Sequence, residues 1–365
     1  MAPAPAVVRP PPGIEPPELP DEGTILVRVP NWVGDAVMAL PALTAITERF
    51  ESHTILVMSR GNVAPLYVGQ KRVAEVVRAG GRGAGRLATA RRALAKRRVA
   101  LGVVMPHSMG SAIETAVGGV DRLWGFGGPM RRLVLDVTLP RRWYAGRHRW
   151  QEYALLAAAV TGRPVPERYP IVTGSGDVAA ADALLAEAGL DEPGGPIVGL
   201  VPTSNARSRR WPVERFAEVA SRLGRDGGRV VVFGASNEGA ITREVVENAD
   251  PEPVDWTGRS PLPVLAELFR RLDFLVTNDT GPMHIAYAVG TPLLALFGAS
   301  REVVTGPRGG ASEVLIHPIY CRPCARNRCA YTLGCLRGIT VDRVVEHVRS
   351  RLDGGPARDV AAPVG

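Results

Sequence analysis

The sequence has no long uncharged hydrophobic run and no segment with the character of an export signal. Its most apolar stretch, residues 279–300, is interrupted by glycines, prolines and a histidine, which argues against a membrane-spanning helix. Residues 1–24 hold eight prolines but lack the basic start and the apolar core of a signal peptide. We therefore expect a disordered leader over residues 1–24 and a soluble, cytoplasmic protein.

Three common nucleotide-binding motifs are also absent. The chain has no G-x-x-x-x-G-K-[ST] loop for a nucleoside triphosphate and no G-x-G-x-x-G after its first expected strand for a dinucleotide. No Asp-x-Asp pair is present to hold a divalent metal against a diphosphate. A formal net charge of +8 nevertheless favours an anionic partner. Because no nucleic-acid recognition motif accompanies this charge, we expect an acidic membrane surface or a phosphorylated small molecule.

The sequence does contain a repeated unit of a short apolar run, a turn and a longer amphipathic stretch. Runs that are apolar on both faces and alternate with helical periods indicate parallel sheets covered by helices on both sides. The helical periods are clearest at 212–223 and 261–272. The apolar runs are 24–30, 53–59 and 100–106 in the first half, and 195–202, 229–235, 273–279 and 292–298 in the second.

A stretch rich in glycine and proline, residues 161–180, separates the two sets of strands and predicts a domain boundary. The expected fold class is α/β, with two doubly wound parallel-sheet domains of Rossmann type that face each other across a cleft. Ligands of such sheets bind at the carboxyl ends of the strands. The expected parts are a leader at 1–24, a first domain at 25–172, a second domain at 173–352 and a tail at 353–365.

The turn after the expected strand at 273–279 is a candidate anion site. Asp279, Thr280 and Gly281 precede a helix whose first N–H groups are free to bind a diphosphate, and glycine leaves room for its approach. Seen alone, Asp279 and Thr280 could equally cap the helix. His284, one turn into the helix, is either a packed histidine or a ligand contact.

Two further loops end strands of the same expected sheet. The loop at 201–212 carries Ser204, Asn205 and three arginines, which could bind phosphate or simply form a solvated basic loop. Glu238 follows the next strand, where an acid can accept hydrogen bonds from ribose hydroxyls or can be an ordinary surface residue. Three loops that converge on one sheet edge favour a nucleotide diphosphate site.

In the first half, the strand-to-helix turn of "VPNWVGDAVMALPAL" (29–43) combines Trp32, Gly34 and Asp35. Such a turn would point its residues into the cleft, where Trp32 offers an apolar face for a sugar ring and Gly34 allows close approach to the backbone. Read locally, Asp35 could be no more than a helix N-cap.

All four cysteines fall in one segment with the spacing C-x2-C-x4-C-x5-C. In a reducing cytoplasm such a cluster indicates a metal site more often than disulfides. The spacing matches no common zinc module closely, so structural zinc, an iron-sulfur cluster and unligated thiols all stay open. The residues are Cys321, Cys324, Cys329 and Cys335.

Five stretches of the chain form a pattern by their order and spacing: "VPNWVGDAVMALPAL", "VMPHSMGSA", "RRWPVERFAEVA", "VVVFGASNE" and "NDTGPMHIAYAVGTPLLALFG". Taken together, they resemble glycosyltransferase family 9, the heptosyltransferases of lipopolysaccharide core assembly, over about residues 25–350. The resemblance implies a GT-B fold, an ADP-L-glycero-D-manno-heptose donor held by the C-terminal domain, and a heptosyl-Kdo-lipid A acceptor held by the N-terminal domain. It also implies inversion at the anomeric centre without a metal.

Carried over position by position, the resemblance makes Asp35 the catalytic base, with Trp32 and Gly34 on the acceptor side, and makes Glu238 a ribose-binding acid. Arg209 stands where relatives usually have lysine; arginine keeps the charge that stabilises a leaving diphosphate but cannot act as an acid at neutral pH. The remaining donor-side matches are Ser204 and Asn205 in the phosphate loop, and Asp279, Thr280, Gly281 and His284 in the diphosphate turn.

The basic stretch at 86–98 fits an acceptor that sits in an anionic membrane, because basic residues near such a surface strengthen docking. We therefore expect peripheral association with the inner face of the cytoplasmic membrane, although a solvated helix face explains the stretch as well. No nucleic-acid partner is expected, and the oligomeric state stays open. The alternative function is another nucleotide-sugar enzyme of GT-B fold: a family 9 transferase with a different sugar or acceptor, or an epimerase-like protein.

Overall fold

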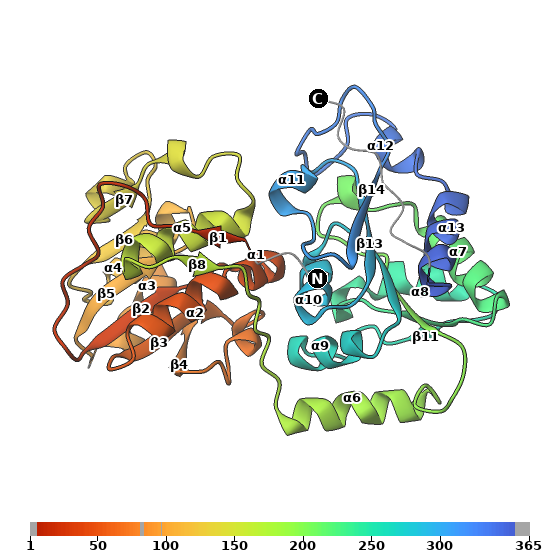
Figure 1. Cartoon of the computed structure of the whole chain (residues 1–365), viewed down its shortest axis with the longest axis horizontal. Coiled ribbons are helices and arrows are strands. Elements are labelled where there is room, and N and C mark those ends of the chain that lie inside the picture. The colour runs from red at the N-terminus through yellow and green to blue at the C-terminus, as the bar shows by residue number, and fades with distance from the viewer. Residues whose placement is uncertain (1–5, 81–83, 96, 355–365) are drawn as a thin grey trace. The chain divides into compact units, whose positions relative to one another are not determined.

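The computed structural model describes residues 6–80, 84–95 and 97–354. The chain divides into two compact units, Met1–Val172 and Thr173–Gly365, coloured red to yellow and green to blue in Figure 1. Each unit contains one six-stranded sheet in which all neighbouring strands are parallel. The predicted class, an α/β protein with two doubly wound parallel-sheet domains, is therefore confirmed.

The N-terminal sheet has the strand order β4-β3-β2-β5-β6-β7, so the chain runs outward from β2 to one edge and then returns to build the other. The order reverses between β2 and β5, which is where ligands of doubly wound sheets bind. The strands are β2 (Thr24–Arg28), β3 (Thr54–Arg60), β4 (Val73–Ala79), β5 (Val99–Val104), β6 (Leu123–Phe126) and β7 (Val137–Leu139).

Helices cover both faces of this sheet, which explains why its central strands are apolar and buried on both sides. α2 packs against α5, and α3 packs against α4. The helices are α1 (Val33–Met38), α2 (Leu40–Arg49), α3 (Ala84–Leu94), α4 (Met109–Ala116) and α5 (Arg149–Thr161), with single turns of 3₁₀ helix η1 (Ala64–Leu66), η2 (Arg131–Leu133) and η3 (Arg141–Trp143).

The C-terminal sheet repeats this topology in the order β11-β10-β9-β12-β13-β14, and its order reverses between β9 and β12. Its strands are β9 (Ile197–Val201), β10 (Arg229–Val232), β11 (Val254–Asp255), β12 (Phe274–Asn278), β13 (Leu293–Phe297) and β14 (Ser312–Ile316). Its helices are α6 (Ser175–Glu187), α7 (Val213–Arg225), α8 (Gly239–Glu247), α9 (Leu262–Arg270), α10 (Gly281–Val289), α11 (Glu302–Thr305), α12 (Gly334–Arg337) and α13 (Val341–Leu352), with η4 (Arg207–Arg209) and η5 (Ser236–Glu238).

Part of the expected disordered leader is ordered instead. β1 (Val7–Val8) pairs antiparallel with β8 (Val165–Pro166), and Val8 is buried. Pro16 lies against Gly162, the residue that ends α5. Prolines are compatible with an extended segment that pairs only briefly, so their number does not by itself predict disorder. Residues 1–5 and most of the predicted tail, 355–365, lie outside the described residues.

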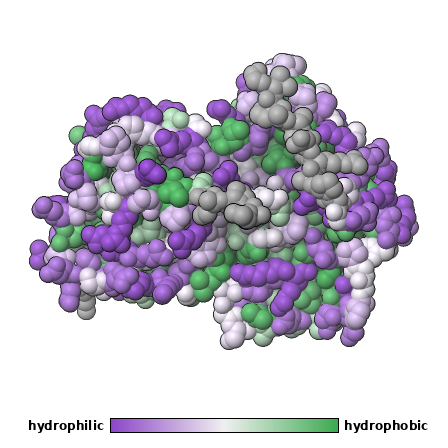
Figure 2. Space-filling view, viewed as in Figure 1, coloured by the Kyte–Doolittle hydropathy of each residue, from purple (hydrophilic) through white to green (hydrophobic). Residues whose placement is uncertain are grey.

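The surface is mostly polar on the side shown in Figure 2, where hydrophobic residues form small, separate groups. Within the described part of the chain, no helix combines the length and the apolar character needed to cross a membrane.

Candidate active site

The turn after β2 lies at the reversal point of the N-terminal sheet and leads into the helix that carries Asp35. α1 begins immediately after it, with Trp32 as the N-cap residue and no side-chain capping bond. Asp35 is therefore not the N-cap but a residue of the first helical turn, and its side chain is 28% exposed. Trp32 is 63% exposed, whereas Gly34 is buried in α1. The turn thus presents an apolar ring and a partly accessible carboxylate.

Two side chains from α5 hold the Asp35 carboxylate. The Tyr153 hydroxyl donates to Asp35 Oδ1 at 3.2 Å, and Arg149 Nε lies 3.8 Å from the same oxygen. Burial raises the pKa of Asp35, while the Arg149 charge and the Tyr153 hydrogen bond oppose the rise. Burial and the nearby Asp35 charge raise the pKa of Tyr153, so that its hydroxyl stays protonated and acts as the donor. A carboxylate with a raised pKa is a stronger base than a solvated one.

The same helix extends this cluster to β5. Glu152, 6% exposed, accepts from Arg149 Nη1 at 2.7 Å and contacts His107 Nε2 at 3.2 Å. The His107 ring stacks on Phe126 with centroids 4.4 Å apart. Arg149, Glu152 and Tyr153 lie three and four residues apart, so they share one face of α5. The cluster therefore joins the ends of β2, β5 and β6 to α5.

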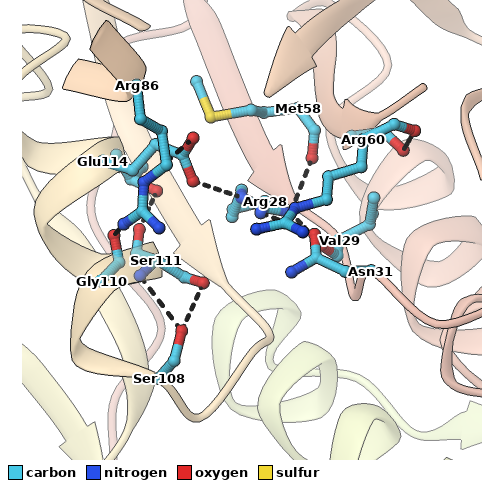
Figure 3. A network of polar contacts seen from close by, with 12 residues as sticks. Arg28, Val29, Asn31, Met58, Arg60, Arg86, Ser108, Gly110, Ser111 and Glu114 are labelled. Carbon is cyan, nitrogen blue, oxygen red and sulfur yellow. Dashed lines mark hydrogen bonds and ion pairs between the residues drawn. The ribbon is translucent and has the colours of Figure 1, made fainter. Parts of the chain in front are cut away.

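A buried arginine holds the start of the turn in place, and Figure 3 shows it among Glu114, Met58 and Asn31. Arg28, the last residue of β2, is 1% exposed, and its Nε lies 3.3 Å from Glu114 Oε2. Its Nη2 donates to Asn31 Oδ1 at 2.8 Å, at the start of the turn, and its Nη1 donates to the carbonyls of Val29 and Met58. Burial lowers the pKa of Arg28, and the Glu114 carboxylate counteracts that effect. The pair ties the turn to α4.

In the C-terminal unit, Asp279 lies directly after β12 at the reversal point of that sheet. It is 3% exposed, and its Oδ2 lies 3.5 Å from Arg209 Nε. Burial raises the pKa of Asp279, and the Arg209 charge opposes this rise. The Arg209 side chain is 36% exposed, so its guanidinium is anchored on one side and accessible on the other. This arrangement suits an arginine that receives a phosphate.

The loop after β9 brings Ser204 to the same turn. Ser204 is buried, and its hydroxyl donates to the Asp279 carbonyl at 2.9 Å. Arg210 Nε donates to the Ser204 carbonyl at 2.6 Å, which fixes the loop. Asn205 is exposed. Ser204 thus orders the loop, whereas Asn205 and Arg209 remain accessible for a ligand.

Glu238 follows β10, in η5. Its Oε2 accepts from the Thr203 hydroxyl at 2.8 Å and from the Ala235 N–H at 3.0 Å. Among the described residues, its Oε1 has no hydrogen-bond partner. The acid is therefore oriented by one oxygen, and the second can accept from a ligand.

The predicted turn before α10 has the expected form. Thr280 is the N-cap residue without a side-chain capping bond, a proline occupies the first turn, and Gly290 ends the helix with φ 86°. The first N–H groups of α10 lie beside Thr280 and Gly281. His284 is 4% exposed and packs against the Tyr287 ring at 5.5 Å, as a packed helix histidine does.

The four cysteines all belong to the described residues and form no disulfide there, and only Cys335, at α12, is buried. Burial, followed by the nearby cysteines, raises the pKa of its thiol. Residues 6–80, 84–95 and 97–354 contain no group of three or more His, Cys, Asp or Glu side chains arranged to hold a metal ion.

Comparison with known proteins identifies the family to which the chain belongs. The family model of glycosyltransferase family 9 (heptosyltransferase) matches residues 87–333. The chain belongs to glycosyltransferase family 9. The predicted resemblance is confirmed, and with it the prediction that the protein is a glycosyltransferase.

Individual members of the family match most of the chain. Lipopolysaccharide heptosyltransferase 2 of Salmonella typhimurium is 27% identical over 80% of this chain and 87% of its own length. Lipooligosaccharide heptosyltransferase 2 of Haemophilus influenzae is 26% identical over 80% and 88%. The structure of the E. coli ADP-heptose lps heptosyltransferase II superposes with a TM-score of 0.74 at 25% identity, covering 91% of this chain and 99% of that one. This match confirms the GT-B type of the two doubly wound domains.

The sequence did not predict that side chains of α5 surround Asp35. No sequence pattern predicts a role for Arg149, Glu152 or Tyr153, and His107 occurs only within the matching stretch "VMPHSMGSA". Two signals in the sequence could have indicated this cluster. One is a histidine just after an expected strand, and the other is the run "RHRWQEY", which places an arginine, a glutamate and a tyrosine on one helical face.

Proposed function

We propose that this transferase moves heptose from ADP-L-glycero-D-manno-heptose to the heptosyl-Kdo-lipid A inner core of lipopolysaccharide, with inversion and without a catalytic metal. The names of its relatives support the donor and acceptor classes. The unit at 25–172 binds the acceptor and the unit at 173–352 binds the donor, in keeping with the separate clusters around Asp35 and Asp279.

The observation that carries the proposal is the environment of Asp35. Its carboxylate is partly exposed, held by Tyr153 and Arg149, and made more basic by burial. It takes the proton from the attacking acceptor hydroxyl as the new oxygen–carbon bond forms on the face opposite ADP. The bond between the anomeric carbon and the diphosphate oxygen breaks, and the electron pair leaves with ADP. Attack from the opposite face inverts the anomeric centre.

Donor-side groups stabilise the leaving diphosphate. Arg209 supplies a positive charge, and the first N–H groups of α10 supply oriented donors beside Thr280 and Gly281. Glu238 offers one free carboxylate oxygen to the ribose hydroxyls. His284, in the first half of α10, is the remaining donor-side residue of this proposal, and its ring contacts that of Tyr287.

Replacement of Asp35 by asparagine tests the assignment. Asp35→Asn should keep ADP-heptose affinity but lower acceptor-dependent ADP release by roughly 10²- to 10⁴-fold, the range for loss of a positioned general base. Asp121→Asn is the matched control, because Asp121 is a half-exposed surface acid of the same unit that pairs with Arg98. Turnover of Asp35→Asn within a few-fold of wild type would refute the base assignment, and acceptor-independent isomerisation of the sugar would point to an epimerase-like enzyme instead.

Structural zinc at Cys321–Cys335 is the remaining part of the proposal. The side chains as placed do not form a metal site, so a four-thiolate zinc would require the 321–335 segment to close around the ion. Metal analysis of protein purified without chelator should then find about one zinc per chain, and chelation should lower thermal stability. Zinc-free protein of undiminished stability would leave four ordinary thiols.

A further inference from the structure

Two arginine-rich stretches of the N-terminal unit differ in how their charges are paired. In the stretch at 86–98, Arg86 lies 3.5 Å from Glu114, Arg97 lies 2.6 Å from Glu75 and Arg98 lies 3.5 Å from Asp121. Lys96 of this stretch lies outside the described residues. These ion pairs compensate much of the charge that had suggested membrane docking.

The segment at 129–147 keeps its positive charge. It contains five arginines and one acid, Asp136, whose Oδ2 accepts from the Leu123 N–H at 2.7 Å. Arg131 is buried and donates to the carbonyls of Ser108 and Phe126. The exposed arginines form no ion pair with any carboxylate of the described chain; they are Arg132, Arg141, Arg142 and Arg147.

Apolar side chains stand beside these arginines. Met130 is 68% exposed and Leu133 is 77% exposed, at the two ends of η2. In η3, Trp143 is partly exposed, and the Arg142 guanidinium lies 5.6 Å from its ring centre. Exposed apolar and indole groups next to unpaired cations match the interface of an anionic bilayer, where the apolar groups enter the headgroup layer and the cations meet phosphates.

The segment lies at the sheet edge that carries the active site. η2 follows β6 and η3 follows β7, and the carboxyl ends of parallel strands meet at one edge. Tyr144, just after η3, lies 5.4 Å from the His107 ring, which contacts Glu152 of the Asp35 cluster. A membrane on this side would therefore present its headgroups near Asp35.

We propose that residues 129–147 form the surface by which this protein docks on an anionic lipid bilayer. The proposal rests on the proposed function in one respect: docking is useful because it gives access to an acceptor held in the membrane. It moves the docking surface from 86–98 to 129–147.

The test uses the full chain and sedimentation with vesicles of phosphatidylcholine, either pure or with about 30% phosphatidylglycerol. Wild type should bind the anionic vesicles at least tenfold more tightly than the neutral ones, and about 0.5 M salt should abolish most of this binding. The double variant Arg141→Glu/Arg142→Glu should lose roughly tenfold or more in affinity, and Leu133→Asp should lose several-fold. The matched control is Arg91→Glu/Arg92→Glu on α3, which makes the same charge change on exposed arginines and should stay within about twofold of wild type.

Two results would overturn the proposal. The first is an equal loss of binding to anionic vesicles in the control variant and in Arg141→Glu/Arg142→Glu. The second is a wild-type protein that does not bind anionic vesicles, whether or not it binds an RNA oligonucleotide. Turnover with an acceptor sugar freed of its acyl chains should be unchanged in all these variants. That measurement separates failure of docking from failure of the proposed transfer reaction.

Discussion

Replacement of Arg28 by methionine should be among the most damaging single changes in the N-terminal unit. Methionine has a similar length but removes the charge that faces Glu114, a side chain 1% exposed. It also removes the donor to Asn31 and the donor to the Met58 carbonyl. The variant therefore leaves Glu114 without its buried cation and removes a donor from Asn31 and from the Val29 carbonyl, whereas the Met58 carbonyl still accepts from the Val29 N–H at 3.1 Å.

The size of the effect follows from burial. Removing one partner of a buried ion pair costs about 3–5 kcal/mol, because the other charge is left uncompensated. Arg86, 24% exposed, still lies 3.5 Å from Glu114 Oε1, so we expect a value near the lower end, about 3 kcal/mol. The double variant Arg28→Met/Glu114→Leu removes both buried charges and should be less destabilised than Arg28→Met alone.

Hydrogen exchange followed by mass spectrometry reads this effect locally. The amides of β2, at 24–28, should exchange faster in Arg28→Met and recover much of their protection in the double variant. Acceptor-dependent turnover should also fall, because the bond from Arg28 to Asn31 fixes the turn that carries Asp35. Unchanged exchange in Arg28→Met, or a double variant that exchanges as fast as the single one, would show that the pair is not a brace.

Three further outcomes are expected. Asp35→Asn should be more stable than wild type at neutral pH. Burial raises the pKa of Asp35 in the folded state, so ionisation of Asp35 destabilises the wild type once the pH rises above the pKa of the unfolded state. The difference in Tm between the variant and the wild type should therefore vanish below about pH 4. Glu238→Ala should weaken ADP binding by roughly 1–3 kcal/mol in calorimetry, whereas Thr203→Val, which removes the hydroxyl that orients the acid, should have a smaller effect. Trp32→Ala should raise the KM for the acceptor with little change in donor affinity, since the ring is exposed beside Asp35; an unchanged KM would remove Trp32 from the acceptor site.

Most inner strands could be predicted from sequence, whereas the edge strands and the short inner strand β6 could not. β2, β9 and β12 are buried almost along their whole length and therefore appear as continuous apolar runs. β4 is an edge strand with only two buried residues, so its sequence lacks such a run. β6 is buried but only four residues long, too short to stand out.

The two candidate sites differ in the same respect. In the C-terminal unit, the turn after β12 has a complete local signature, because the capping position, the proline and the terminal glycine all belong to one helix. The cluster around Asp35 in the N-terminal unit joins residues 118 positions apart in the sequence, Asp35 and Tyr153. No local pattern encodes such a contact, so Arg149, Glu152 and Tyr153 emerged only from the fold.

The residues of the turn after β2 serve separate purposes, which explains why a tryptophan, a glycine and an acid occur together. Asn31 is fixed from inside by Arg28, while Trp32 projects outward at 63% exposure. Gly34 is buried in α1, and one residue later Asp35 meets Tyr153. A capping acid would need only the free N–H groups of its own helix, but this carboxylate is held by another helix and retains an open side. Local sequence rules predict an acid at this place as a simple helix cap, and the structure departs from that prediction. Such departures occur most often at functional sites, which is consistent with a chemical role for Asp35.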